Sequence, residues 1–253
     1  MDNLNVQVAS GGTEKIITPI KKSRLSDEVV VQLTNLILSG EFEPGSKLPT
    51  ERELASMLSV TRTSLREALR RMETMGLIRA LPSNGNYVED YTVNCTLEFV
   101  KFLVSRGIGL DQDFIMSLEE TRRILAVKMV ELAVERIDDA SVASLREIAG
   151  KFPRNVTPEL LSGEWDFRFF RQIAVATGNK VFVCMMNSIK DLFGMLRWLY
   201  CRLDEKHLEG AAEFNGRLVD ALSKRDRRQA VELIEQRMTR DGEILRDLLK
   251  NMK

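Results

Sequence analysis

Three arginines recur every four residues in one short segment of the chain, at Arg62, Arg66 and Arg70. On a helix this spacing places the three charges on one face, and each such pair destabilises an isolated helix by about 0.2 to 0.5 kcal/mol. A polyanion lying against the face would relieve this repulsion, so the pattern favours contact with a nucleic acid. The alternative is a charged face that is simply solvated.

Hydroxyl-bearing residues stand at the start of the same segment, at Thr61, Thr63 and Ser64. Hydroxyls and backbone amides at a helix N-terminus suit phosphate oxygens, which leaves the arginines to reach base edges. Segment 61–72 carries four arginines against Glu67, a net charge of +3, whereas the whole chain balances 37 basic against 37 acidic residues. The positive charge that nucleic-acid binding requires is therefore local.

Two short helices are predicted to position this face. Thr50 followed by Glu53 forms a capping box, so the first helix is expected to begin at Glu51 and to end before Ser59. The apolar residues expected on its buried side are Leu54, Met57 and Leu58.

The second helix is expected to follow Thr61, which suits an N-cap, and to end at Gly76, which suits a left-handed C-terminal position. Its apolar residues have the spacing of a buried stripe that lies away from the arginines. This stripe consists of Leu65, Leu69 and Met72.

A third helix and a hairpin flank this pair. Ser26 and Asp27 are expected to cap a helix that ends at Gly40, and Pro44-Gly45 predicts a turn after it. Extended runs at 77–81 and 86–89 flank Pro82-Ser83-Asn84-Gly85, and Asn-Gly between such runs favours a hairpin. The buried residues of the third helix are expected to be Val30, Leu33 and Ile37.

The segment EFEPGSKLPTERELASMLSVTRTSLREALRRMETMGLI, with VVVQLTNLILSG before it, resembles the winged helix-turn-helix of the GntR family of bacterial transcription regulators. The resemblance implies that Gly85 lies at the wing tip, although the family's usual Gly-x-Gly wing is here Ser83-Asn84-Gly85-Asn86. Arg70 joins the predicted DNA-binding residues as the third arginine of the row. The residues on positions that contact operator DNA in the family are Arg52, Thr61, Arg62, Thr63, Ser64 and Arg66.

The composition of 253 residues, 44% of them hydrophobic, suffices for two domains. We expect a flexible arm at 1–19, a winged helix-turn-helix domain at 20–90 and an all-helical effector-binding and dimerisation domain at 91–253. The three cysteines are far apart, no apolar run reaches about 18 residues, and the first twenty residues lack the apolar core of a signal peptide. These features predict a cytoplasmic protein with no membrane partner.

The fold class predicted is mainly α, a winged helix-turn-helix followed by an all-α bundle of six to seven helices. Helical periodicity covers nearly the whole segment after residue 90, and no strand is expected there. The helices are predicted at 92–106, 111–137, 140–149, 164–177, 179–202, 205–222 and 226–250.

Polar residues interrupt the apolar stripes of these helices. Arg122 lies in line with Leu118, Leu125, Met129 and Leu132. A polar group in such a place is either part of a buried ion pair that only sets the packing or part of a ligand site. Three more residues are in similar positions: Asp166, Asn215 and Arg237.

Residues 122–237, and above all WDFRFFRQIAVATGNKVF, resemble the helical FCD-type effector domain of the FadR-like subgroup. In its commoner version, Asp-x-x-x-His and two later histidines hold a divalent metal under a carboxylate effector. Asp166 keeps the aspartate, but Phe170, Asn215 and Arg237 replace the histidines. Because Phe offers no lone pair and Arg adds a positive charge, we expect no metal, with Arg237 neutralising Asp166 instead.

The only histidine, His207, is expected on a helix surface, because one imidazole does not make a metal site. The resemblance implies that Arg122 binds the carboxylate of a small organic-acid effector by a two-pronged contact, in a pocket lined also by Asp166, Asn215 and Arg237.

The sequence thus predicts a homodimeric DNA-binding regulator, a repressor, that binds a palindromic operator and is modulated by this effector. One alternative is a helical domain that only dimerises or interacts, with no metabolite. An enzyme is not supported, because the chain shows no second carboxylate near Asp166, no histidine base, no Gly-rich phosphate loop and no Cys-His pair.

Overall fold

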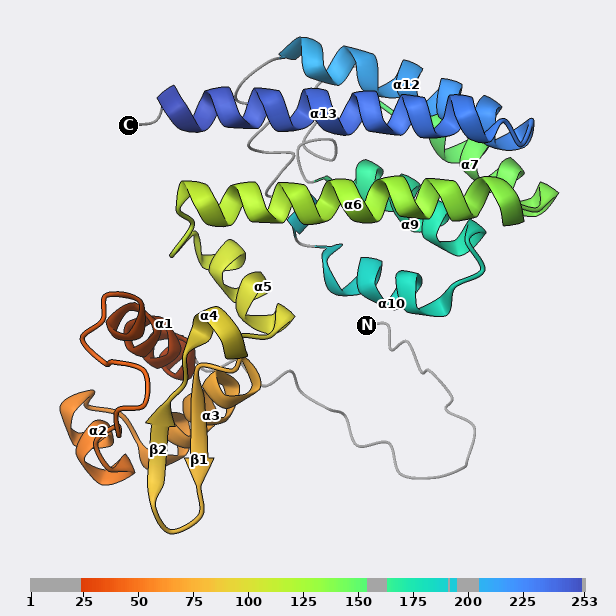
Figure 1. Cartoon of the computed structure of the whole chain (residues 1–253). Helices are drawn as coiled ribbons and strands as arrows, with labels where there is room; N and C mark the ends of the chain where they lie inside the picture. Colours follow the sequence, from red (N-terminus) through yellow and green to blue (C-terminus); the bar gives the residue numbers. More distant parts are fainter. Residues whose placement is uncertain (1–23, 154–162, 191, 195–204, 252–253) are drawn as a thin grey trace, which may run out of the picture.

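The computed structural model describes residues 24–153, 163–190, 192–194 and 205–251. Its described part is mainly helical, with a single two-stranded antiparallel sheet near the N-terminus, as predicted (Figure 1). The arm expected at 1–19 lies outside the described residues. The helix expected at 179–202 already ends at Ser188, and residues 195–202 lie outside the described residues.

The N-terminal unit contains the predicted helices and hairpin. The predicted capping box is confirmed: Thr50 Oγ1 accepts from the backbone N–H of Glu53, while the Glu53 carboxylate accepts from Thr50. Thr61 caps the next helix by accepting from Ser64 N–H. The elements are α1 Arg24–Leu38, α2 Glu51–Met57, α3 Arg62–Thr74, β1 Ile78–Leu81 and β2 Gly85–Val88.

Two of the local predictions were wrong. Ser26 and Asp27 do not cap α1 but lie inside its first turns, because the helix already begins at Arg24. Met57 is 71% exposed, and Ala55 takes its place in the core beside Leu54. The helix is only seven residues long, so its narrow buried side accommodates two adjacent residues and leaves Met57 on the solvent side.

The hairpin pairs Ile78 with Val88 and Leu81 with Gly85, in antiparallel register. Three residues, 82–84, connect the strands instead of the four expected, because Gly85 belongs to the second strand, and the positive φ angles fall at Ser83 and Gly85. Lys47 adds a single bridge to Tyr87, so the segment before α2 lies against the hairpin.

The helix expected at 92–106 is divided into α4 Tyr91–Asn94 and α5 Leu97–Arg106, with extended backbone between them. Tertiary contacts explain the interruption. Thr96 donates from its backbone N–H to Met75 and from its hydroxyl to Thr74, which fixes this segment against the end of α3. Hydrogen bonds to α3 replace those that a continuous helix would form.

The core of the N-terminal unit extends past residue 90 into α5. Phe99, Phe102 and Leu103 are buried with the apolar residues of α1, α3 and the hairpin. Phe114, at the start of the next helix, packs partly buried against the same cluster. The predicted stripes are confirmed at Val30, Leu33, Ile37, Leu65, Leu69 and Met72, which are all buried.

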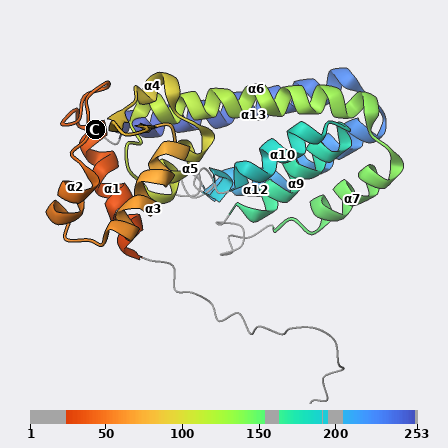
Figure 2. The ribbon, with the colours of Figure 1, turned by 90° about the horizontal axis from the view of Figure 1, so that it is seen from below.

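The C-terminal domain is a helical bundle in which α6 and α13 run side by side in opposite directions (Figures 1 and 2). The largest core cluster lies among α6, α7, α9, α10, α12 and α13. No helix in the described ranges has both the length and the apolar character of a membrane span. The bounds are α6 Gln112–Arg136, α7 Asp139–Gly150, α9 Glu164–Ala176, α10 Lys180–Ser188, α12 Glu205–Ser223 and α13 Arg227–Asn251.

The two domains meet where α6 begins and α13 ends. Ile115 of α6 is buried with Leu245 and Leu249 of α13, and Leu110 touches both this small cluster and the N-terminal core. The end of α13 therefore packs against Ile115, the neighbour of Phe114, and Phe114 contacts the core of the N-terminal unit.

Candidate nucleic-acid interface and ligand pocket

The predicted basic face is exposed. Arg62, Arg66 and Arg70 are exposed on α3, next to its buried stripe. The structure leaves the remaining predicted DNA-binding residues exposed or half-buried near the start of α3, on α2 and at the wing: Arg52, Thr61, Thr63, Ser64 and Gly85. The hydroxyls of Thr61 and Ser64 lie 3.0 Å apart and hydrogen-bond to each other.

Arg66 is oriented by an acidic residue from the neighbouring helix. Its Nε donates to Oε2 of Glu51 at 2.6 Å, which joins the first residue of α2 to the middle of α3. Arg66 remains 63% exposed. No ion pair is found for Arg52, Arg62 or Arg70 within the described residues.

A hollow of about 470 Å³ opens between α2, α3 and the wing. Glu51 and Arg66 line one side, and the wing residues Asn84 and Gly85 line the other. Lys47, which the sequence analysis did not select, donates from Nζ to Asn84 Oδ1 at 3.2 Å and lies above the Tyr87 ring. A cation beside the wing tip adds positive charge where the segment before α2 meets the hairpin.

Asp27 connects three helices of the N-terminal unit. Its carboxylate pairs with Arg71 of α3 and, at 3.1 Å, with Arg106 at the end of α5. Burial by itself raises the pKa of Asp27, but the hydrogen bonds and charges of Arg71 and Arg106 together lower it below the usual value. The carboxylate is thus ionised and fixes α3 against α1.

Four charged side chains form a network between α6 and α13. Arg122 donates from Nε and Nη2 to both carboxylate oxygens of Glu119, at 2.7 and 2.8 Å. Nη2 also donates to Oδ2 of Asp241 at 2.9 Å, and Arg237 Nε lies 3.0 Å from Oδ1 of the same residue. Glu119 and Asp241 are almost fully buried, so the arginines neutralise them in the interior.

The predicted stripe of α6 is rotated from its expected position. Of the residues aligned with Arg122, Met129 is buried, whereas Leu118, Leu125 and Leu132 are only partly buried. Glu119 lies on the buried side because Arg122 pairs with it, and Arg122 also pairs with Asp241 of α13. The i, i+3 spacing of Glu119 and Arg122 and the i, i+4 spacing of Arg237 and Asp241 are the signals that could have revealed this network.

The four predicted effector residues are only partly brought together. Arg122 and Arg237 meet through Asp241. Asn215 is 4% exposed, and its Nδ2 has no hydrogen-bond partner among the described residues. Asp166 is half-buried on α9, one turn before Phe170, which shares with Arg122 the lining of a small apolar cavity of about 20 Å³.

The residues at the family's metal positions do not fit a metal ion. Phe170 packs edge-on against Phe169, with ring centroids 5.9 Å apart, and offers no donor atom. The Arg237 guanidinium lies over the Phe214 ring and pairs with Asp241. Only Asp166 and Asn215 carry oxygen donors, too few for a protein-held divalent cation. The side chain of His207 lies outside the described residues.

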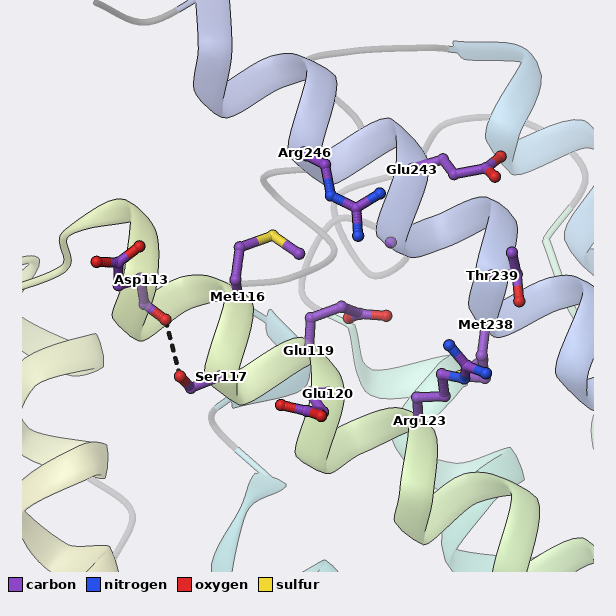
Figure 3. A pocket seen from close by; sticks show the side chains of 11 residues that line it. Asp113, Met116, Ser117, Glu119, Glu120, Arg123, Met238, Thr239, Glu243 and Arg246 are labelled. Atoms are coloured by element: carbon purple, nitrogen blue, oxygen red, sulfur yellow. Dashed lines mark hydrogen bonds between the residues drawn. The ribbon is translucent and has the colours of Figure 1, made fainter.

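An open cleft of about 660 Å³ is lined by residues of α6 and α13 (Figure 3). Glu120 and Arg123 of α6 and Glu243 and Arg246 of α13 line it, with buried Glu119 on its floor. Figure 3 shows these charges distributed along both helices, with both signs interspersed. This arrangement is that of a solvated helix pair, and none of the four predicted effector residues lines the cleft.

Comparison with known families assigns both parts of the chain. Residues 25–88 match the family described as bacterial regulatory proteins, gntR family, and residues 117–240 match the FCD domain. The chain is a GntR-family regulator with an FCD domain. Its exposed arginine row and wing therefore belong to a DNA-binding transcription regulator and not to an enzyme.

Named relatives agree with this assignment. The uncharacterized transcriptional regulator YcbG of Bacillus subtilis is 28% identical over 210 residues, covering 83% of this chain and 85% of YcbG. The transcriptional repressor NanR of an Enterobacter species is 27% identical over 179 residues, covering 68% of this chain and 66% of NanR.

A solved structure supports the fold. Lar, which controls expression of the Listeria monocytogenes agr system, aligns with a TM-score of 0.55 at 17% identity. The alignment covers 92% of this chain and all of that chain, so the two-domain arrangement of the GntR-family regulator is shared over nearly its full length.

Proposed function

We propose that the protein is a homodimeric repressor that binds a palindromic operator through the basic face of α3, the start of α2 and the wing. The exposed row of Arg62, Arg66 and Arg70, on a helix anchored by its buried stripe, supports this proposal most directly. The name of NanR supports the repressor role. The DNA-binding residues in this proposal are Arg52, Thr61, Arg62, Thr63, Ser64, Arg66, Arg70 and Gly85.

Two recognition helices are needed, because one winged unit contacts few base pairs. A dimer would place its two α3 helices about 34 Å apart, one DNA turn. Selection of preferred duplexes from a random-sequence library by the full-length protein tests this arrangement. We expect a motif with two-fold symmetry and a complex of two chains per duplex; a single asymmetric half-site bound by one chain would contradict it.

The effector in this proposal is a small organic acid that competes for Arg122. Glu119 and Asp241 already engage Nε and Nη2 of this guanidinium, so an incoming carboxylate would have to replace one of them. Replacing Asp241 would break the link from α6 to α13 and displace α13, whose end packs beside the N-terminal unit. The dimer would then have two arrangements, with different spacings of its DNA-reading units. The effector would shift the balance between them only as far as its own affinity for the two arrangements differs.

Calorimetry with a panel of small mono- and dicarboxylates tests this part of the proposal. Arg122→Ala should lose at least about tenfold in affinity, since charge-assisted hydrogen bonds to a buried guanidinium contribute about 1.5 to 3 kcal/mol. Arg123→Ala, which removes the neighbouring exposed arginine, is the matched control and should bind as the wild type does. Equal affinity in both variants removes Arg122 from the proposal.

A second candidate is a C-terminal domain that only dimerises and binds no metabolite. Two observations favour this candidate. Arg122 is already paired with two internal carboxylates, and Phe170 stands at the family's metal position. Thermal unfolding in the presence of the same acids distinguishes the candidates, because a bound effector stabilises the folded state by an amount that grows with the logarithm of its concentration. An unchanged transition throughout would support the interaction module.

We also propose that the domain works without a bound metal, since Phe170, Asn215 and Arg237 stand where histidines would bind one. Titration of the full-length protein with Zn²⁺ and Ni²⁺ should show no tight stoichiometric site. Tight binding that is lost in Asp166→Ala would overturn this proposal.

A further inference from the structure

Arg66 differs from the other arginines of the basic face in having one of its nitrogens already occupied. Nε donates to Oε2 of Glu51 at 2.6 Å, and no other hydrogen bond to this guanidinium is found among the described residues. The terminal nitrogens Nη1 and Nη2 are thus available on a side chain that is 63% exposed.

The guanidinium is planar, so a carboxylate bound at Nε fixes the direction in which the two terminal nitrogens point. Guanine presents two acceptors, N7 and O6, side by side in the major groove, and a pair of guanidinium nitrogens matches them. A group fixed at Nε and free at its ends is therefore prepared for a bidentate contact with one guanine.

We propose that Glu51 is a positioning residue that makes Arg66 specific for guanine at one operator position. Glu51 acts only through Arg66. This inference rests on the proposed contact of Arg66 with the operator. Glu51 and Arg66 both line the hollow between α2, α3 and the wing, and the carboxylate of Glu51 contacts Arg66 from α2.

The charge of Glu51 gives the proposal a distinctive signature. A carboxylate near the duplex repels phosphates, so it weakens binding to any sequence. A carboxylate in this place can still contribute discrimination between base pairs instead of affinity. Loss of the carboxylate should thus lower sequence preference while nonspecific binding stays equal or tightens.

The test uses the full-length protein and a preferred duplex selected from a random-sequence library. Affinity is measured for that duplex, for single base-pair variants of it and for an unrelated duplex. A bidentate arginine contact discriminates about 5- to 150-fold against the wrong base pair. Glu51→Ala should remove most of this preference at one G·C pair, and Arg66→Ala should remove it at the same pair.

Glu67→Ala is the matched control, because it removes an exposed negative charge from α3 that has no ion pair with Arg66. Glu67→Ala should change nonspecific binding in the same direction as Glu51→Ala, but it should keep the preference for the G·C pair. Glu51→Gln keeps an acceptor oxygen at the same reach and should restore part of the preference.

The outcomes separate this inference from the proposed function. If Glu51→Ala keeps the full preference for the G·C pair and Arg66→Ala loses it, the positioning role of Glu51 is overturned, while Arg66 still contacts the base. Full preference in Arg66→Ala overturns the contact on which the inference rests. If Glu51→Ala does not fold, as judged by thermal unfolding, an unchanged preference in the folded Glu51→Gln and Glu51→Asp variants overturns the positioning role.

Discussion

Arg122 of α6 and Asp241 of α13 form an ion pair with 2.9 Å between Nη2 and Oδ2, in the interior of the C-terminal bundle. Among the described residues, Glu119 also pairs with Arg122, and Arg237 also pairs with Asp241. Such a buried network need not stabilise the fold more than apolar residues would, but removing one member leaves an uncompensated charge. Arg122 thus contributes to the packing of α6 against α13 by neutralising buried carboxylates on both helices.

Arg122→Met should lower the free energy of unfolding by about 3 to 5 kcal/mol, because Glu119 and Asp241 would remain buried without their common partner. Chemical denaturation of the full-length protein measures this. Lys151→Met removes a cation from the exposed pair with Glu147 and should change stability by less than about 1 kcal/mol. Equal, small losses in both variants would show that the network is solvated.

Asp27→Asn should destabilise the protein at neutral pH by about 1 to 2 kcal/mol, since Arg71 and Arg106 lose their shared carboxylate. Folding lowers the pKa of Asp27 from its usual 3.8, so its contribution is complete above that pH and is lost as the pH falls through the lower folded pKa. The difference between wild type and variant should therefore shrink below about pH 4.

Denaturation curves between about pH 2.5 and 7 test the prediction, because this range extends from neutral pH to below the usual pKa of Asp27. Asp247→Asn, at an exposed carboxylate on α13, serves as the control and should show no comparable difference at any pH. A gap between wild type and Asp27→Asn that stays constant down to the lowest pH would contradict it.

Gly76→Ala should destabilise the N-terminal unit more than Gly40→Ala. Both glycines have positive φ, so alanine costs about 1 to 2 kcal/mol at either position. At Gly76 a Cβ atom would also lie 2.1 Å from the carbonyl oxygen of Asn94, whereas nothing lies within 4 Å at Gly40. Overpacking adds about 1 to 3 kcal/mol at Gly76 alone.

Urea denaturation of the two variants tests this difference. Because Gly76 lies where α4 and α5 dock onto the end of α3, its substitution should also weaken operator binding at temperatures well below unfolding. Equal stability of the two variants would mean that the α4 segment moves aside without cost.

Arg70→Ala should weaken binding to all duplexes to a similar degree, if Arg70 contacts phosphate at the end of the arginine row. The slope of log affinity against log salt concentration should then fall by about one unit. Arg228→Ala, at an exposed arginine of α13, is the control and should keep the wild-type slope. An unchanged slope in Arg70→Ala, or a selective loss at one base pair, would assign Arg70 a different role.

The sequence by itself determined the local elements of the DNA-binding unit. The capping box of Thr50 and Glu53, the N-cap Thr61 and the stripe Leu65, Leu69 and Met72 act over three to seven residues, so neighbouring residues suffice to specify them. The arginine row could be assigned to the exposed face for the same reason.

Only the tertiary structure decided which charges meet. Glu51 and Arg66 are separated by 15 positions, Arg122 and Asp241 by 119, and no periodicity connects residues so far apart. The division of 92–106 into α4 and α5 likewise arises from hydrogen bonds to α3, and the burial of Glu119 from its ion-pair partner. Local sequence specifies a helix and its faces, but the partner of a buried or positioned charge depends on how the helices pack.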